Sequence, residues 1–175
     1  LPPFRPRRTE EEIRKQMPWA TQGKLAGHKR NVITSLELDP AIMEENNIRF
    51  QAKYRKIEEA EVRYEEIGCE NADYLMIAFG SMARICLKTQ EMALAEGIKV
   101  GVLRPITLWP FPSKIIAEYA NKVKGMISVE LNAGQMVEDI RLAVNGKVKV
   151  EHFGRLGGIV PTPDEVLNAL KQKLM

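Results

Sequence analysis

The chain has 175 residues, of which 45% are hydrophobic and 28% are charged, a composition that fits a folded domain with a sizeable core and excludes a disordered chain. The formal net charge of +3 is too small to indicate nucleic-acid binding. No apolar run approaches the roughly 20 residues of a membrane helix and no apolar signal core is visible at the start, so we expect a cytoplasmic protein with no membrane partner.

Residues 1–30 are predicted to form a basic, proline-containing arm or linker. They carry eight Lys or Arg residues against three Glu, a net charge of about +5, and show little apolar periodicity. Such a segment either contacts an acidic partner or is a solvated tail. Because the chain starts at Leu1 rather than Met, we interpret it as a piece of a longer polypeptide.

Residues 31–70 are expected to form an extension of the main domain. The β-rich run at 31–36 predicts a short strand. A long polar segment at 41–66 follows Asp39 and Pro40, and its apolar residues do not form one clean helical stripe. We therefore expect a helix that packs on a neighbour or bridges to one.

Strands and helices alternate from residue 71 to residue 175. Apolar runs predict strands at 74–79, 99–103, 126–129 and 148–153, and helical spacing predicts helices at 82–96, 115–123 and 136–144. Thr162, Pro163 and Glu165 mark the start of a last helix. This order predicts one α/β domain with an open, mostly parallel sheet and helices on both faces.

The turns after the strands are the candidate ligand site, because open parallel sheets bind ligands beyond the carboxyl ends of their strands. These turns carry Ser81, Arg104, Asn132 and Arg155. Ser81 either caps the following helix or helps to hold an anion there. Arg155, beside a pair of glycines, either binds a carboxylate or phosphate or belongs to a loop that fixes the last helix against the sheet. An independent small-anion-binding module is therefore an alternative function.

Three further residues have more than one interpretation. Glu130 closes a buried strand, where burial is expected to raise its pKa and make it a candidate acid; otherwise it caps a helix or pairs with Arg104. Trp109 is either a core residue or an interface anchor. His152 lies in the strand expected at 148–153, where we expect it to face away from Val150 and to be exposed or at an interface.

We predict no metal or cofactor site in this chain alone. Cys69 and Cys86 form no CxxC pair, whereas an iron–sulfur cluster normally needs four thiolates, and zinc is equally unsupported. Cys86 falls on the apolar face of an expected helix and is predicted to pack in the core. The chain has no GxGxxG, no Walker A lysine and no recognisable Ser, His and Asp arrangement.

Several segments together resemble a known family. IAFGSMARICLKTQEMALAEGIKVGVLRPITLWPFP and ISVELNAGQMVEDIR are similar to the transketolase C-terminal domain, in the version found in the α-type subunit of 2-oxoacid:ferredoxin oxidoreductases. That subunit type includes the 2-ketoisovalerate and 2-oxoglutarate enzymes, which the chain resembles most. FGRLGGIVPTPDEVL is similar to the C-terminus of the subunit, and the upstream NVITSLELDP, KIEEAEVRYEE and ADYL are most similar to its ketoisovalerate-type branch. The resemblance covers residues 31–175.

This resemblance implies an oxidoreductase that decarboxylates 2-oxoacids with coenzyme A and passes electrons to ferredoxin. It also implies thiamine diphosphate, Mg²⁺ and iron–sulfur clusters for the full complex, bound by other domains and subunits. The GDG…N diphosphate pattern and the cluster cysteines are absent here, so we expect an isolated chain that binds none of these cofactors and is inactive. The implied role is a structural or assembly domain of a homo- or hetero-oligomeric complex; an independent oligomerisation module is the alternative.

Overall fold

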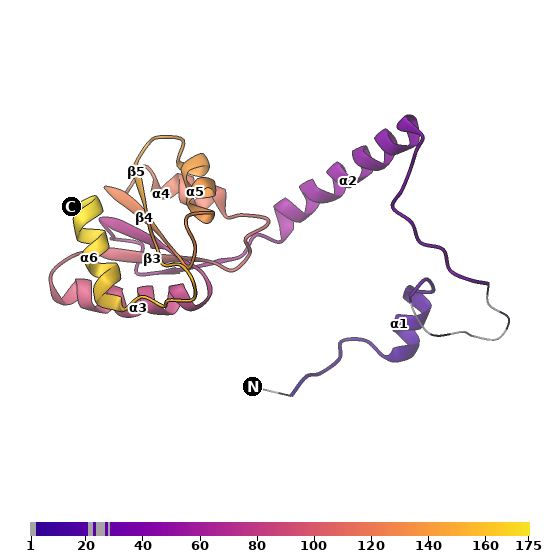
Figure 1. The fold of residues 1–175 in the computed structure, drawn as a ribbon, viewed down its shortest axis with the longest axis horizontal. Coiled ribbons are helices and arrows are strands. Elements are labelled where there is room, and N and C mark those ends of the chain that lie inside the picture. Colours follow the sequence, from indigo (N-terminus) through magenta and orange to yellow (C-terminus); the bar gives the residue numbers. More distant parts are fainter. Residues whose placement is uncertain (1–2, 21–22, 24–26, 28) are drawn as a thin grey trace. The chain divides into compact units, whose positions relative to one another are not determined.

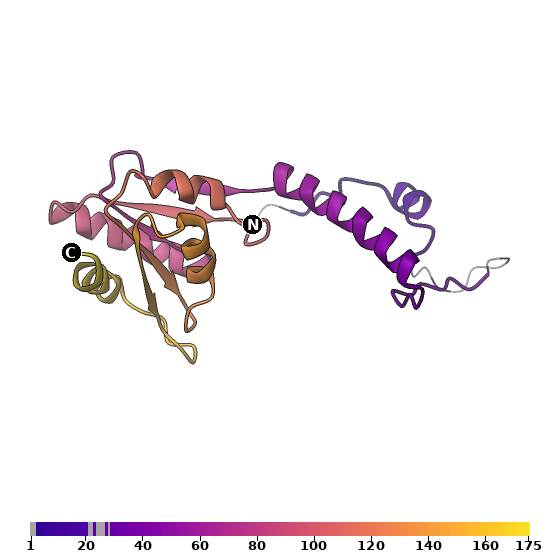
Figure 2. The same cartoon turned by 90° about the horizontal axis from the view of Figure 1, so that it is seen from above.

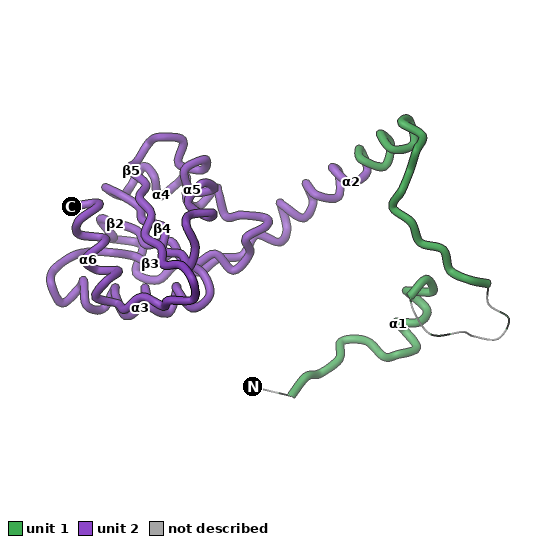
Figure 3. Tube along the Cα trace, viewed as in Figure 1, with its two compact units in different colours: residues 1–48 green, residues 49–175 purple. Residues whose placement is uncertain are grey.

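A computed structural model describes residues 3–20, 23, 27 and 29–175, and the chain divides into two compact units, residues 1–48 and 49–175 (Figure 3). The first unit contains α1 (Glu10–Gln16) and the beginning of α2 (Pro40–Ala60). A capping box starts α1, because Thr9 accepts a hydrogen bond from the Glu12 amide and the Glu12 carboxylate accepts one from the Thr9 amide. Neither helix has a buried residue.

The segment between these helices corrects one expectation. Residues 31–36 form no strand, and Val32 and Ile33 are 79% and 70% exposed. A β-rich run becomes a strand only when a neighbouring strand takes its backbone hydrogen bonds, and none of the described residues pairs with this one. The predicted helix after it is confirmed as α2, but it ends at Ala60, before the expected polar segment does.

The second unit is built on a five-stranded sheet in the order β1-β3-β2-β4-β5. The four expected strands are present as β2 (Tyr74–Ile77), β3 (Val100–Pro105), β4 (Gly125–Glu130) and β5 (Lys149–Gly154), all parallel. The fifth, β1 (Tyr64–Ile67), pairs antiparallel with β3 and was not expected. Its sequence, YEEI, has no apolar run because it is an exposed edge strand, so periodicity did not distinguish it from the helix before it.

Helices cover both faces of this sheet (Figures 1 and 2). α3 (Gly80–Ala95) and α6 (Pro163–Leu174) pack on one face, and α4 (Ser113–Tyr119) and α5 (Met136–Val144) pack on the other. The predicted open, mostly parallel sheet with helices on both faces is confirmed.

The core is two clusters separated by the sheet, because successive strand residues point to opposite faces. Met76 and Ile127 pack with Cys86 of α3 and Leu170 of α6. On the other face, the neighbouring strand residues pack with α4 and α5: Leu75, Ile77, Met126, Ile116 and Ile140. The predicted core position of Cys86 is confirmed.

Within the described ranges, no helix combines the length and the apolar character needed to cross a bilayer.

Candidate functional site at the carboxyl edge of the sheet

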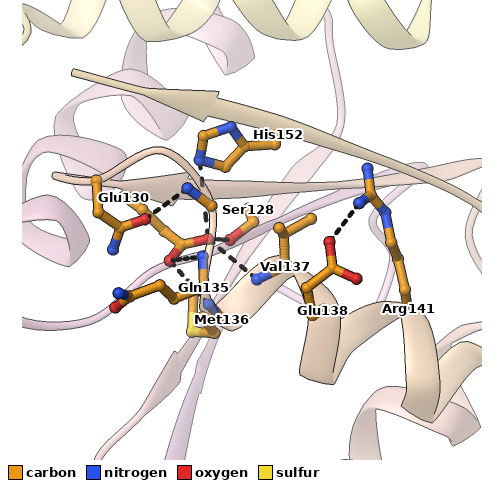
Figure 4. A network of polar contacts seen from close by, with 10 residues as sticks. Ser128, Glu130, Gln135, Met136, Val137, Glu138, Arg141 and His152 are labelled. Atoms are coloured by element: carbon orange, nitrogen blue, oxygen red, sulfur yellow. Dashed lines mark hydrogen bonds and ion pairs between the residues drawn. The ribbon is translucent and has the colours of Figure 1, made fainter. Parts of the chain in front are cut away.

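Glu130 is the most buried charged residue at the carboxyl edge of the sheet, with an exposed fraction of 1%. One carboxylate oxygen accepts hydrogen bonds from the Ser128 hydroxyl at 2.7 Å and the Val137 amide at 3.0 Å. The other accepts from the amides of Met136 at 2.9 Å and Gln135 at 3.2 Å (Figure 4). These amides lie at the start of α5 and have no partner within the helix, so Glu130 caps α5 from the preceding strand.

The electrostatics of Glu130 differ from the expectation. Burial by itself raises the pKa of a carboxyl, but the hydrogen bonds from Ser128, from the Met136 amide and from the Asn132 side chain outweigh it, and the pKa of Glu130 is lowered from 4.5. The expected raised pKa was wrong because the sequence does not show these donors. Glu130 is therefore held as a carboxylate and is not suited to be a general acid.

His152 lies beside this carboxylate on β5. Its Nε2 atom is 3.9 Å from a Glu130 oxygen and, among the described residues, has no hydrogen-bond partner (Figure 4). His152 shares the sheet face of Val150, contrary to the expectation, because residues two apart on a strand point the same way. A Cβ added to Gly154 would lie only 2.7 Å from the ring, so the absence of a side chain at Gly154 makes room for it.

The turn that follows Glu130 depends on two close approaches. The Asn132 side chain accepts a hydrogen bond from the Gly134 amide at 2.7 Å, which shapes the turn into α5. A Cβ on Gly154 would lie only 2.2 Å from the Asn132 carbonyl oxygen. Only glycine therefore fits at that strand end. Asn132 is thus a structural residue of the β4–α5 turn.

The two arginines of the expected anion site are not brought together. Arg104 pairs with Glu65 of β1 at 2.8 Å, and Arg155 pairs with Glu165 of α6 at 2.8 Å. Arg104 lies near the end of β3 and Arg155 follows β5, and these two strands are three strand spacings apart, or about 14 Å. Each arginine is paired with a different acid, and the expected pairing of Arg104 with Glu130 is wrong because β2 lies between their strands.

Arg155 instead connects a loop to a helix. Glu165, its partner, also completes the predicted capping box of α6, in which Thr162 accepts from the Glu165 amide. The Arg155 amide donates to the Glu130 carbonyl at 3.3 Å. These contacts fix the last helix against the sheet.

Ser81 is not the cap of α3. The N-cap position is Phe79, which makes no side-chain cap hydrogen bond, and Ser81 is an exposed residue of the first turn. α3 begins at Gly80, two residues before the expected start of the helix at residue 82. Gly80 takes a positive φ of 57°, which glycine adopts without strain.

Trp109 is 55% exposed and is not a core residue. Its ring meets the ring of Tyr54 of α2 edge to face, with the centroids 5.6 Å apart. The neighbouring Thr107 hydroxyl donates to the Pro110 carbonyl at 2.9 Å, and the Thr107 amide donates to the Arg63 carbonyl at 3.1 Å. The β3–α4 loop therefore holds the C-terminal part of α2.

The same edge also exposes large apolar side chains from three consecutive turns. These residues, each between 43% and 59% exposed, are Ile106, Leu108, Trp109, Leu131, Leu156, Ile159 and Val160. Since β3, β4 and β5 are parallel, the turns after them lie along one edge of the sheet. Sequence reasoning identified only Trp109 of this set, because a single exposed apolar residue has no distinctive pattern.

The residues present do not fit an iron–sulfur cluster. Cys69 and Cys86 belong to core clusters on opposite faces of the sheet, and burial raises the pKa of Cys69 to about 11 and that of Cys86 to about 12. Within the part of the chain that is described, no three His, Cys, Asp or Glu side chains are grouped so that they could hold a metal ion.

The sequence matches a known protein family over residues 72–166. That family is described as pyruvate:ferredoxin oxidoreductase core domain II. The chain is also 45% identical over 161 residues to the ketoisovalerate oxidoreductase subunit VorB of Methanothermobacter thermautotrophicus, covering 92% of this chain and 45% of that protein. It is 34% identical over 101 residues to the 2-oxoglutarate synthase subunit KorA of Methanothermobacter marburgensis, covering 58% of this chain and 27% of that protein. The chain spans about half the length of the VorB relative.

Two solved structures share the fold. The 2-oxoglutarate:ferredoxin oxidoreductase of Magnetococcus marinus, solved with 2-oxoglutarate, coenzyme A and succinyl-CoA bound, matches with a TM-score of 0.68 and 26% identity over 79% of this chain and 24% of that chain. A split-gene transketolase, an inactive β4 tetramer, matches with a TM-score of 0.54 and 19% identity over 64% of this chain and 42% of that chain. The second match concerns the fold alone and agrees with the transketolase-like fold expected.

Proposed function

The chain belongs to the pyruvate:ferredoxin oxidoreductase core domain II family, and we propose that it is a structural and assembly domain of a 2-oxoacid:ferredoxin oxidoreductase. The complete enzyme would decarboxylate a 2-oxoacid with coenzyme A and pass electrons to ferredoxin. The higher identity and longer coverage of the VorB relative, compared with the KorA relative, favour 2-ketoisovalerate as the substrate.

The observation that carries this proposal is the nature of the carboxyl edge. Its charged groups are satisfied within the chain, since Glu130 caps α5 while Arg104 and Arg155 pair with acids. Its surface is apolar at Leu131 and Ile159, among others. An edge with neutralised charges and exposed apolar side chains is suited to pack against protein rather than to bind a small charged substrate.

Thiamine diphosphate, Mg²⁺ and the iron–sulfur clusters would then be bound by the rest of the complex. The two buried, unpaired cysteines of this chain agree with work in a reducing cytoplasm. In this proposal, Ser81, Trp109 and Asn132 contribute to the contact surface, and none of them is a catalytic residue.

Reconstitution with the other subunits of the oxidoreductase tests the proposal. The chain alone should not reduce ferredoxin with 2-ketoisovalerate and coenzyme A, whereas the assembled complex should. Leu131→Asp combined with Ile159→Asp should lower assembly and activity about tenfold or more, because it places two charges in an apolar contact. Leu94→Asp combined with Leu142→Asp is the matched control, since these residues are 56% and 81% exposed and belong to α3 and α5 rather than to the turns.

Two outcomes would contradict the proposal. One is turnover by the purified chain without the other subunits. The other is normal assembly of the Leu131→Asp and Ile159→Asp variant.

A further inference from the structure

A groove of about 590 Å³ lies in the second unit, away from the carboxyl-edge turns after β4 and β5. It is bounded by the last residues of α2, by β1 and by the start of α4. Its apolar lining is Val62, Tyr64, Phe111, Pro112 and Ile115. Two aromatic rings and a proline make this lining suitable for an extended, proline-containing chain.

The rim of the groove is acidic. Glu58 and Glu59 of α2 and Glu118 of α4 line it, with Lys114 as the single cation, so the lining carries a net charge of about −2. All three carboxylates are on exposed residues, and no ion pair within the described ranges engages any of them. The groove therefore offers unpaired negative charge beside apolar surface.

One segment of the chain has the complementary chemistry. Pro3–Arg8 reads PFRPRR and carries three arginines and no acid. These residues are exposed and non-helical, and the Phe4 side chain is 90% exposed. In a polyproline II conformation, with three residues per turn, Pro3 and Pro6 lie on one side and Arg5 and Arg8 on another. The prolines can then contact the apolar lining while the arginines meet the acidic rim.

We propose that this groove binds the Pro3–Arg8 segment of a second copy of the chain. Every copy carries both the groove and the segment, so two copies can exchange segments in a closed, symmetric pair. Six residues of polyproline II extend about 19 Å, long enough to pass from the rim across the lining. The contact depends on charge, so it weakens as ionic strength rises.

Sedimentation of the whole chain at several concentrations tests the proposal. The wild-type chain should form dimers at low salt. Reversing the groove charge with Glu58→Lys and Glu118→Lys should weaken association about tenfold or more, and so should reversing the segment charge with Arg5→Glu and Arg8→Glu. Combining all four changes should restore it. Mixing the two double variants should give mixed dimers, because each of their two contacts then joins opposite charges.

The matched control has the same charge change on the same helix. Glu44→Lys with Glu45→Lys alters α2 about 20 Å from Glu58, given 1.5 Å of rise per residue, and should change association less than about twofold. Thermal melting of each variant checks that the fold is kept.

A labelled peptide of residues 1–9, LPPFRPRRT, gives an independent measurement by fluorescence anisotropy. It should bind the Arg5→Glu and Arg8→Glu chain saturably, and adding Glu58→Lys and Glu118→Lys to that chain should weaken binding about tenfold. A wild-type chain that stays monomeric at every concentration, or a peptide affinity unchanged by the groove substitutions, would overturn the proposal.

Discussion

Glu130 is buried beside the first amides of α5, and its hydrogen bonds come from a hydroxyl and from backbone amides. Hydrogen bonds to an ionised group are roughly twice as strong as those between neutral groups, and the start of a helix favours negative charge. The carboxylate is therefore kept ionised in the core by local dipoles, and its contribution is to stability rather than to acid catalysis.

Glu130→Gln should reduce the free energy of unfolding by about 2–3 kcal/mol, because the neutral amide loses the charge and turns one acceptor into a donor that faces backbone amides. Chemical denaturation of the two proteins measures the difference. Glu138→Gln, on an exposed residue of the same helix, is the control and should stay within about 0.5 kcal/mol. Equal stabilities of Glu130→Gln and wild type would show that the cap is not energetically important.

Stability should also depend on pH through Glu130. The folded-state pKa lies below the unfolded value of 4.5, so the folded state holds the carboxylate more strongly than the unfolded chain does. The resulting stabilisation is present above pH 4.5 and is lost as the pH falls through the folded pKa. Melting temperatures between pH 3 and 6 should therefore fall less steeply for Glu130→Gln than for wild type.

The sequence identified Glu130, Arg104 and Arg155 as residues of the carboxyl edge, but it did not identify the groups that contact them. It placed Glu130 correctly at the end of a buried strand, because a run of apolar residues ends there. It predicted the wrong pKa direction because the compensating donors come from the following turn, whose geometry depends on Asn132, Gly134 and Gly154. The ion pairs of Arg104 and Arg155 were missed in the same way, since each involves a different element.

At the scale of elements, the β4–α5 turn and the end of β5 are fitted to each other. Gly154→Ala should be strongly destabilising, by about 3 kcal/mol or more, because its Cβ would lie 2.2 Å from the Asn132 carbonyl and a backbone atom cannot move aside cheaply. Gly125→Ala is the matched control on β4. Its Cβ would meet only the end of the Leu174 side chain, at 2.9 Å, which can change rotamer. Denaturation midpoints of the two variants measure the contrast, and equal losses would contradict it.

The elements that sequence predicted well share a physical cause. β2, β4, α5 and α6 bury apolar residues at regular spacing, so their periodicity is imposed by the core. β1 and the segment at 31–36 bury little, and their conformation depends on whether a neighbouring strand is available. Local sequence does not contain that information. A strand was therefore expected at residues 31–36, where there is none, and β1 was not expected.

At the scale of the whole molecule, the buried core lies entirely in the second unit. The buried hydrophobic residues run from Cys69 to Leu170, whereas α1 and α2 contain none among the described residues. The contact of α2 with the β3–α4 loop, through Tyr54 and Trp109, adds about 1 kcal/mol. Cooperative unfolding of the chain should therefore report on the second unit.

At high salt, where the copies do not associate, removing residues 1–39 should lower the melting temperature of the α/β core by less than about 2 °C, because α2 is left intact and no buried apolar area is lost. Removing residues 1–60 also deletes Tyr54 and should lower the melting temperature further, because the aromatic contact with Trp109, worth about 1 kcal/mol, is lost. Tyr54→Ala in the whole chain separates that contact from the loss of the helix and should reproduce most of the second change. Calorimetry compares the three variants with the wild-type chain. A large drop in melting temperature on removal of residues 1–39 would contradict the prediction, because it would mean that these residues stabilise the core.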